Sequence, residues 1–272
     1  TNWKLIWDWG DVRRIDYHNF IRFDIVSPTM QEGKGFNDCY KIMEGLKEVG
    51  SVDVTKSMGF HVQIDVSELT LSNLVKVCQN FIKFEPIMDT LMPLSRRGDH
   101  TYCKSNRDKM LGPDGVTSLS SNEDRHKRIE ACKSVTELCE VMNPGNIRNY
   151  KLNLQNLRRG SQPIRTIEFR QHLSTQNYND AKMWIHFCMA FVHNSARFRS
   201  PSFLGTGSSR NMDKQFEMLF EYVIKDRCLR NFYRVRRSSH NIKTESDRVY
   251  CSECLEGSQC VACRRPTKRP RS

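Results

Sequence analysis

The chain has 272 residues, of which 38% are hydrophobic, and a formal net charge of +12 at pH 7. This length allows one large domain or two small ones with a buried core, and no stretch of about 18 apolar residues is present to span a membrane. The 11 cysteines are odd in number and mostly scattered, which favours free thiols in a reducing intracellular compartment, most simply the cytoplasm, over a disulfide scaffold.

The positive charge is unevenly distributed along the chain. Residues 227–272 contain 12 Lys and Arg against 4 Asp and Glu, so this segment carries about +8 of the total. A basic tail of this kind is typical either of a solvated segment or of one that contacts a polyanion such as nucleic acid. We therefore divide the chain into a domain over residues 1–226 and a basic, cysteine-rich tail over 227–272.

The first half of the chain alternates predicted strands and helices. Strands are expected over residues 3–8, 20–26 and 57–65. Apolar residues at helical spacing predict helices over 36–49 and 70–91, the second one interrupted by Pro86. This order favours an α+β or mixed α/β fold with helices on one face of a sheet.

The second half begins with a polar segment. Residues 95–146 contain a short helical stretch near 129–142 and predict an insertion or lid over a site or, alternatively, a plain surface loop. Residues 149–154 lead into a central strand that ends at His172. A helix capped by Asp180 follows, whose apolar stripe we assign to the core, and a last helix is expected over 212–224.

Two of these strands carry polar faces that could form a site together. Alternation along the central strand places four polar side chains on one of its faces: Thr166, Glu168, Arg170 and His172. In the same way, one face of the 57–65 strand carries His61, Gln63 and Asp65. A carboxylate can hold a divalent cation, and a guanidinium can bind a phosphate through two parallel hydrogen bonds. The pattern therefore indicates metal and nucleotide chemistry, although an exposed, salt-bridged sheet face is the alternative.

These strands resemble the amidoligase family, carboxylate-amine ligases of the glutamine synthetase and glutamate-cysteine ligase superfamily. The resemblance runs from about Trp3 to Phe198 and is carried by segments whose order and spacing match: Phe23-Asp24-Ile25-Val26-Ser27-Pro28, Gly59-Phe60-His61-Val62-Gln63, Tyr150-Lys151-Leu152-Asn153-Leu154 and Thr166-Ile167-Glu168-Phe169-Arg170-Gln171-His172. It implies an α+β, glutamine synthetase-like catalytic domain with a curved antiparallel sheet whose concave face holds ATP and Mg²⁺.

The resemblance also implies an ATP- and Mg-dependent ligase that forms an amide bond through an acyl phosphate. His61, Glu168 and Arg170 would be the catalytic residues. His61, Glu168 and Asp24 would hold Mg²⁺, and Gln63, Arg165 and Arg170 would bind the nucleotide. The substrates would be a carboxylate and an amine, each a small molecule, a peptide or a protein side chain, and no membrane is implied.

This chain departs from the family pattern at its beginning. It starts at Thr1, after the strand rich in paired Glu residues that opens the family, so we expect an N-terminally truncated member. Asp24 stands where a Glu is usual, and Gln63 stands where a second His is usual. Each change alters a group near the metal or the nucleotide, so activity of this chain is a separate question from its ancestry.

The tail supports a second hypothesis. Cys251, Cys254, Cys260 and Cys263 form a CxxC-x5-CxxC array that could bind Zn²⁺, although free thiols in an unstructured tail are the alternative. The basic end from Arg264 onward could act as a nuclear signal or contact phosphates. In this alternative the domain is a catalytically degenerate scaffold, and its zinc-binding tail engages a protein or a nucleic acid.

Overall fold

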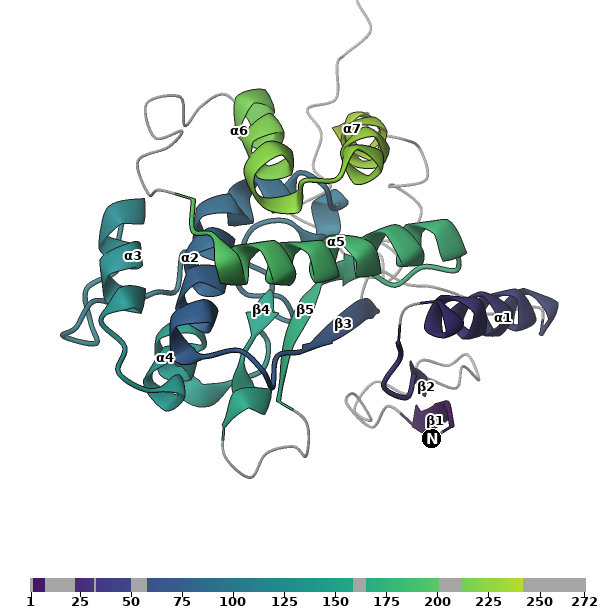
Figure 1. The fold of residues 1–272 in the computed structure, drawn as a ribbon, viewed down its shortest axis with the longest axis horizontal. Coiled ribbons are helices and arrows are strands. Elements are labelled where there is room, and N and C mark those ends of the chain that lie inside the picture. The colour runs from purple at the N-terminus through teal and green to yellow at the C-terminus, as the bar shows by residue number, and fades with distance from the viewer. Residues whose placement is uncertain are drawn as a thin grey trace, which may run out of the picture. The chain divides into compact units, whose positions relative to one another are not determined.

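The computed structural model describes residues 2–7, 23–31, 33–49, 58–158, 165–200 and 212–241. This part of the chain is α+β, with two small antiparallel sheets and seven α-helices (Figure 1). None of its helices is both long and apolar enough to cross a bilayer. The elements, in chain order, are β1 Lys4–Trp7, β2 Phe23–Val26, α1 Lys34–Glu48, β3 Gly59–Asp65, α2 Leu71–Asp89, η1 Leu94–Arg96, α3 Asn122–Glu130, α4 Val135–Met142, η2 Pro144–Asn146, β4 Leu152–Asn153, η3 Gln155–Leu157, β5 Thr166–Leu173, α5 Tyr178–Arg197, α6 Met212–Met218, η4 Leu219–Ile224 and α7 Arg227–Asn241.

The chain divides into two compact units. The smaller one comprises residues 1–53 and 176–182, and the larger one comprises residues 54–175 and 183–272. In the smaller unit β1 pairs with β2 in antiparallel fashion, as the sequence predicted for two strands in this region. The Tyr178 hydroxyl donates to the Phe36 carbonyl at 3.1 Å, and its ring lies edge-on to that of Tyr40.

The core of the larger unit lies against one face of a three-stranded antiparallel sheet in the order β3-β5-β4. Phe169, in the central strand β5, contacts Phe81 of α2 and both Trp184 and Phe191 of α5. The apolar stripe of α5 is therefore core, as predicted. Since α2 and α5 cover the Phe169 face, the neighbouring residues of β5 point toward the opposite face.

Pro86 does not interrupt α2. The helix starts with a capping box at Thr70 and continues to Asp89. Proline removes the N–H that would bond to the carbonyl four residues earlier, which is that of Ile82. Nη1 of Arg107 donates to this carbonyl at 3.4 Å, so a side chain from another segment replaces the missing hydrogen bond.

The polar segment 95–146 is neither a lid nor a plain surface loop. Ile129 of α3 and Leu138 of α4 are fully buried in the core. The side chains of Asn106 and Asn143 each donate to the carbonyl of Leu152 and accept a backbone N–H of the same segment. These two side chains therefore supply the hydrogen-bond partners of the outer edge of β4, which fixes the position of Asn153 beside the central strand.

Helix α7 lies in the segment that we assigned to the tail. Its residues Leu229 and Tyr233 are buried, and the Tyr233 ring lies 5.3 Å from that of Phe187. The described part of the chain ends at residue 241. The boundary between domain and tail therefore stays a prediction, and so do the proposed zinc ligands at 251, 254, 260 and 263, which lie outside the described residues.

Candidate functional site

The face of the sheet opposite α2 and α5 carries a cluster of polar side chains at the middle of the three strands. Pairing places Gln63 of β3 and Asn153 of β4 on either side of Glu168 in β5. Alternation along β5 puts Thr166 and Arg170 on the same face as Glu168. We call His61, Asn153, Glu168 and Arg170 the Glu168 cluster.

Glu168 is the central acceptor of this cluster. Its side chain is 2% exposed. One carboxylate oxygen, Oε1, accepts from Nη1 of Arg170 at 2.9 Å, and the other, Oε2, accepts from Nδ2 of Asn153 at 2.6 Å. The buried carboxylate is therefore fully hydrogen-bonded, as buried charges must be.

His61 is the member of the cluster that reaches solvent, with 35% of its side chain exposed. Its Nδ1 lies 3.4 Å from Oε1 of Glu168 and 3.4 Å from Nη1 of Arg170. Burial and the charge of Arg170 lower the pKa of His61 to about 4, despite the opposing effect of Glu168. The imidazole is thus neutral at physiological pH, the form that can bind a metal or accept a hydrogen bond.

Gly59 makes room for this arrangement. A Cβ on Gly59 would lie 2.7 Å from Nε2 of His61, closer than real Cβ contacts allow. The same point is 3.5 Å from Nη2 of Arg96. The missing side chain therefore lets the His61 ring lie against the strand, with Arg96 on its Nε2 side.

The other predicted site residues are placed differently. Gln63 lies next to the cluster and accepts from the Thr166 hydroxyl at 3.3 Å. Arg165 precedes β5 at the end away from Arg170, and its charge acts on Cys139 of α4. Asp24 belongs to β2 in the smaller unit, which is described by itself. The functional roles of all three stay predictions.

The sequence analysis predicted that His172 lies on the same face as Glu168, and this prediction is wrong. The pairing of β3 with β5 shifts by one residue between Phe60 and Val62, which is a β-bulge. Beyond this shift the alternation of β5 is reversed. The His172 ring lies 5.4 Å from that of Trp184 and 5.8 Å from that of Phe60, on the core side.

Two arginines near the cluster were missed by the sequence analysis. The charges of Arg96 and Arg148 both lower the pKa of His61. Arg96 ends the short helix η1, which lies against β5, whereas Arg148 is exposed. Neither residue occurs in a strand or a recognisable motif, so only the spatial arrangement reveals them. Asn153, by contrast, stood in one of the segments that carry the family resemblance.

The described residues do not form a metal site by themselves. No three His, Cys, Asp or Glu side chains in this part of the chain are arranged to hold a metal ion. His61 and Glu168 are two candidate ligands, but both oxygens of Glu168 are engaged. A magnesium ion bound mainly by nucleotide phosphates and water needs only one or two protein carboxylates, and Glu168 fits that more limited role.

Comparison with known families gives one match. Residues 1–192 match the family described as "Putative amidoligase enzyme", which covers most of the chain. The chain belongs to the amidoligase family. Neither the comparison with curated proteins nor the comparison with solved structures gave a match. The matched range of this amidoligase includes every residue of the Glu168 cluster and ends within α5.

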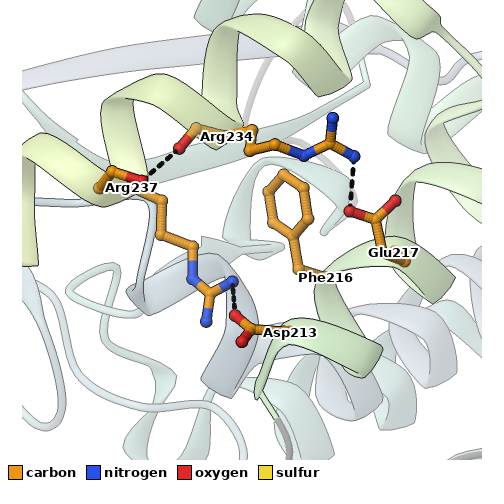
Figure 2. A pocket seen from close by; sticks show the side chains of 6 residues that line it. Asp213, Phe216, Glu217, Arg234 and Arg237 are labelled. Atoms are coloured by element: carbon orange, nitrogen blue, oxygen red, sulfur yellow. Dashed lines mark hydrogen bonds and ion pairs between the residues drawn. The ribbon is translucent and has the colours of Figure 1, made fainter.

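A separate pocket lies outside the range shared with the amidoligase family. It has a volume of about 300 Å³ and is lined by residues of α6 and α7 (Figure 2). Arg237 bonds Asp213 at 2.7 Å and lies over the Phe216 ring, and Arg234 bonds Glu217 at 2.7 Å (Figure 2). Because both arginines are paired with acids, this pocket offers no unsatisfied charge, and we assign the contacts to the packing of α7 on α6.

Proposed function

We propose that this amidoligase is an ATP-dependent carboxylate-amine ligase that works at the Glu168 cluster. The observation that supports the proposal is the meeting of His61, Glu168 and Arg170 within 3.4 Å of one another on the face of the sheet away from the core. These three residues come from the two strands that carry the resemblance to glutamine synthetase-like enzymes. The superfamily placement and the dependence on ATP and Mg²⁺ are parts of this proposal.

The chemistry requires two anions to be brought together. An oxygen of the substrate carboxylate attacks the terminal phosphorus of ATP, the bond to the bridging oxygen breaks, and ADP leaves. The amine nitrogen then attacks the carbon of the acyl phosphate and loses a proton, and phosphate leaves as the amide forms. Because carboxylate and phosphate repel each other, the site must present positive charge and exclude water.

The side chains of the cluster are suited to these tasks. The planar guanidinium of Arg170 can bind two phosphoryl oxygens at once, which orients the group for transfer. Neutral His61 adds a nitrogen acceptor or ligand at the exposed edge of the cluster without a further charge. Asn153 holds Glu168 in place through Oε2.

Magnesium would arrive with the nucleotide and would neutralise phosphate charge, with Glu168 and His61 as its protein ligands. In the structure Oε1 of Glu168 is bonded to Arg170. Transfer of the Arg170 guanidinium from this oxygen to a phosphate would leave Oε1 open.

The proposal is tested by ATP turnover with a panel of amino acids, amines and short peptides. We expect phosphate release that requires Mg²⁺, a carboxylate and an amine together. A substrate carboxylate labelled with ¹⁸O should transfer one labelled oxygen to the released phosphate, which is specific to an acyl phosphate.

Variants connect this activity with the cluster. Glu168→Gln and Arg170→Gln should each lower turnover by about a hundredfold or more, since each removes a charge near the transferred group. Glu137→Gln, which changes an exposed carboxylate in α4, is the matched control and should keep full activity. ATP hydrolysis that is unaffected by the substrates or by Glu168→Gln would reject the proposal.

A further inference from the structure

Arg96 is a buried cation without an acidic partner. Its residue is 1% exposed, and Nη2 donates to the backbone carbonyl of Met58. Its Nε has no hydrogen-bond partner in the described part of the chain, and no carboxylate there forms an ion pair with it. An uncompensated charge of this kind is costly, so its presence requires an explanation.

The thiol of Cys103, which as a thiolate could compensate Arg96, is not charged. Cys103 favours the charged form of Arg96, but burial raises the pKa of the Cys103 thiol to about 12. The thiol is therefore neutral at physiological pH. Arg96 cannot avoid the problem by deprotonation, because a guanidinium stays protonated in proteins.

A second buried guanidinium lies close to the first. Arg170 is 7% exposed, and its Nε also has no hydrogen-bond partner among the described residues. The charge of Arg170 disfavours the charged form of Arg96. Glu168 compensates one of these two cations, so the pair retains an excess of one positive charge.

The imidazole of His61 lies near both guanidiniums. Its Nδ1 faces Nη1 of Arg170 at 3.4 Å. Its Nε2 and the Nη2 of Arg96 lie 2.7 and 3.5 Å from the position that a Cβ on Gly59 would take. The side chain of His61 is partly exposed, so its ring can move toward solvent and admit a ligand to Arg96 and Arg170. Exposed Arg148 adds a positive charge near this entrance.

We propose that Arg96 and Arg170 together bind one tetrahedral phosphoryl group, which enters past the imidazole of His61. The anion neutralises the excess charge and accepts hydrogen bonds from both guanidiniums. A phosphoryl group fits better than a carboxylate, because its oxygens point in several directions and can reach donors on two separate guanidiniums. This inference rests on the proposed function only for the source of the group, the terminal phosphate of ATP.

The test is the binding of inorganic phosphate and tripolyphosphate to the whole chain without metal ions. Binding is measured by calorimetry and by the shift in melting temperature. Both anions should stabilise the wild-type protein by mass action. Arg96→Gln should weaken binding by about tenfold or more, the loss expected for one charge-assisted hydrogen bond. Arg96→Lys keeps the charge but not the planar guanidinium, so its affinity for phosphate should lie between those of the wild type and Arg96→Gln. If Arg96→Gln does not fold, Arg96→Lys is the decisive variant.

Arg125→Gln is the matched control. Arg125 is also buried and also donates to backbone carbonyls, but it lies on α3 and has acidic residues near it. This variant should lose stability and keep phosphate affinity. Wild-type affinity in both Arg96 variants, an equal loss in Arg125→Gln, or acetate binding as tightly as phosphate would overturn the inference.

Binding without turnover separates this inference from the proposed function. Phosphate binding that depends on Arg96, in a protein that never forms an amide, would reject the ligase and keep the anion site. Amide formation that is unchanged in the Arg96 variants would keep the ligase and reject the role of Arg96 in the anion site.

Discussion

Two buried ionic clusters in the larger unit differ in how their charges are compensated. In the first, Nζ of Lys151 lies 3.0 Å from Oε1 of Glu85 and 2.7 Å from Oδ2 of Asp89. The remaining carboxylate oxygens accept from the backbone N–H of Arg107 and from the side chain of Gln171. Every oxygen in this cluster has a donor.

The first cluster sets two carboxylates against one ammonium group, so its excess charge is negative, whereas the excess in the second cluster, around Arg96, Glu168 and Arg170, is positive. Glu168 pairs with Arg170, Arg96 forms no ion pair in the described part of the chain, and each of the two guanidiniums keeps an Nε without a partner there. Burial is similar in the two clusters, so burial alone does not distinguish a structural ion pair from a binding site. The sign of the excess charge does, together with the two Nε atoms that lack acceptors, because, of these two clusters, the second one gains from an added anion.

The largest effect is expected from Lys151→Met. It leaves Glu85 and Asp89 buried without their cation and should cost about 3–5 kcal/mol of unfolding free energy, measured by urea denaturation. Adding Glu85→Gln to this variant should recover part of the loss, because one of the two unpaired carboxylates is then neutral. A loss below about 1 kcal/mol would mean that water already enters this cluster.

A buried histidine shows how the chain normally avoids an uncompensated cation. His126 is 2% exposed, and neither of its ring nitrogens has a hydrogen-bond partner in the described residues. Burial and the nearby charge of Arg199 lower its pKa to about 4. Burial lowers the pKa of Lys83 in the same direction, to about 8, although Lys83 stays mostly protonated at pH 7 and donates to the Ser200 hydroxyl. Arg96 cannot respond in this way, since it cannot lose its proton.

The lowered pKa of His126 predicts a loss of stability in acid. The unfolded state binds a proton near pH 6.5 and the folded state only near pH 4, so stability falls as the pH drops through this window. The loss should reach about 3 kcal/mol at most. His126→Gln should make this part of the profile of stability against pH less steep and leave the contribution of His61, whose pKa is also lowered to about 4, whereas His193→Gln, an exposed control, should leave the profile unchanged. An unchanged profile in His126→Gln would contradict the assignment.

Glu168→Gln should sharpen the contrast between the two ionic clusters. It removes the carboxylate that pairs with Arg170, and we expect a loss of about 2 kcal/mol in the absence of ligand, because a buried guanidinium is left without its charged acceptor. Inorganic phosphate should recover part of this loss, because the site then carries a larger excess of positive charge. The measurement is a pair of urea titrations with and without phosphate. Equal midpoints in the two titrations would show that the cluster has no preference for anions.

Local patterns in the sequence were enough to bring the main site residues together. Period-two alternation placed Glu168 and Arg170 on one face of β5, and a matching strand supplied His61. The core helix with Trp184 followed from apolar residues at helical spacing. In each case the relevant signal lies within a few residues of the side chain itself.

Features that depend on distant residues could not be predicted in this way. The bulge that turns His172 to the core depends on the pairing with β3. Pro86 is accommodated because Arg107 reaches the carbonyl of Ile82. Helix α7 was hidden by the high charge of its segment, although Tyr233 anchors it in the core.

The smallest expected change in stability concerns Gly59. In Gly59→Ala the new Cβ would meet Nε2 of His61 at 2.7 Å, and the ring, which is partly exposed, can move outward. We expect a stability change of about 1 kcal/mol or less, measured by thermal unfolding. Moving the ring away from Arg96 and Arg170 should change phosphate affinity more than stability.

Gly45→Ala in α1 is the matched control, since nothing lies within 4 Å of its Cβ. It should stabilise its helix slightly and leave phosphate binding unchanged. If Gly59→Ala keeps wild-type affinity for phosphate, the position of the His61 ring does not control entry to the site, and the two guanidiniums must be reached by another route.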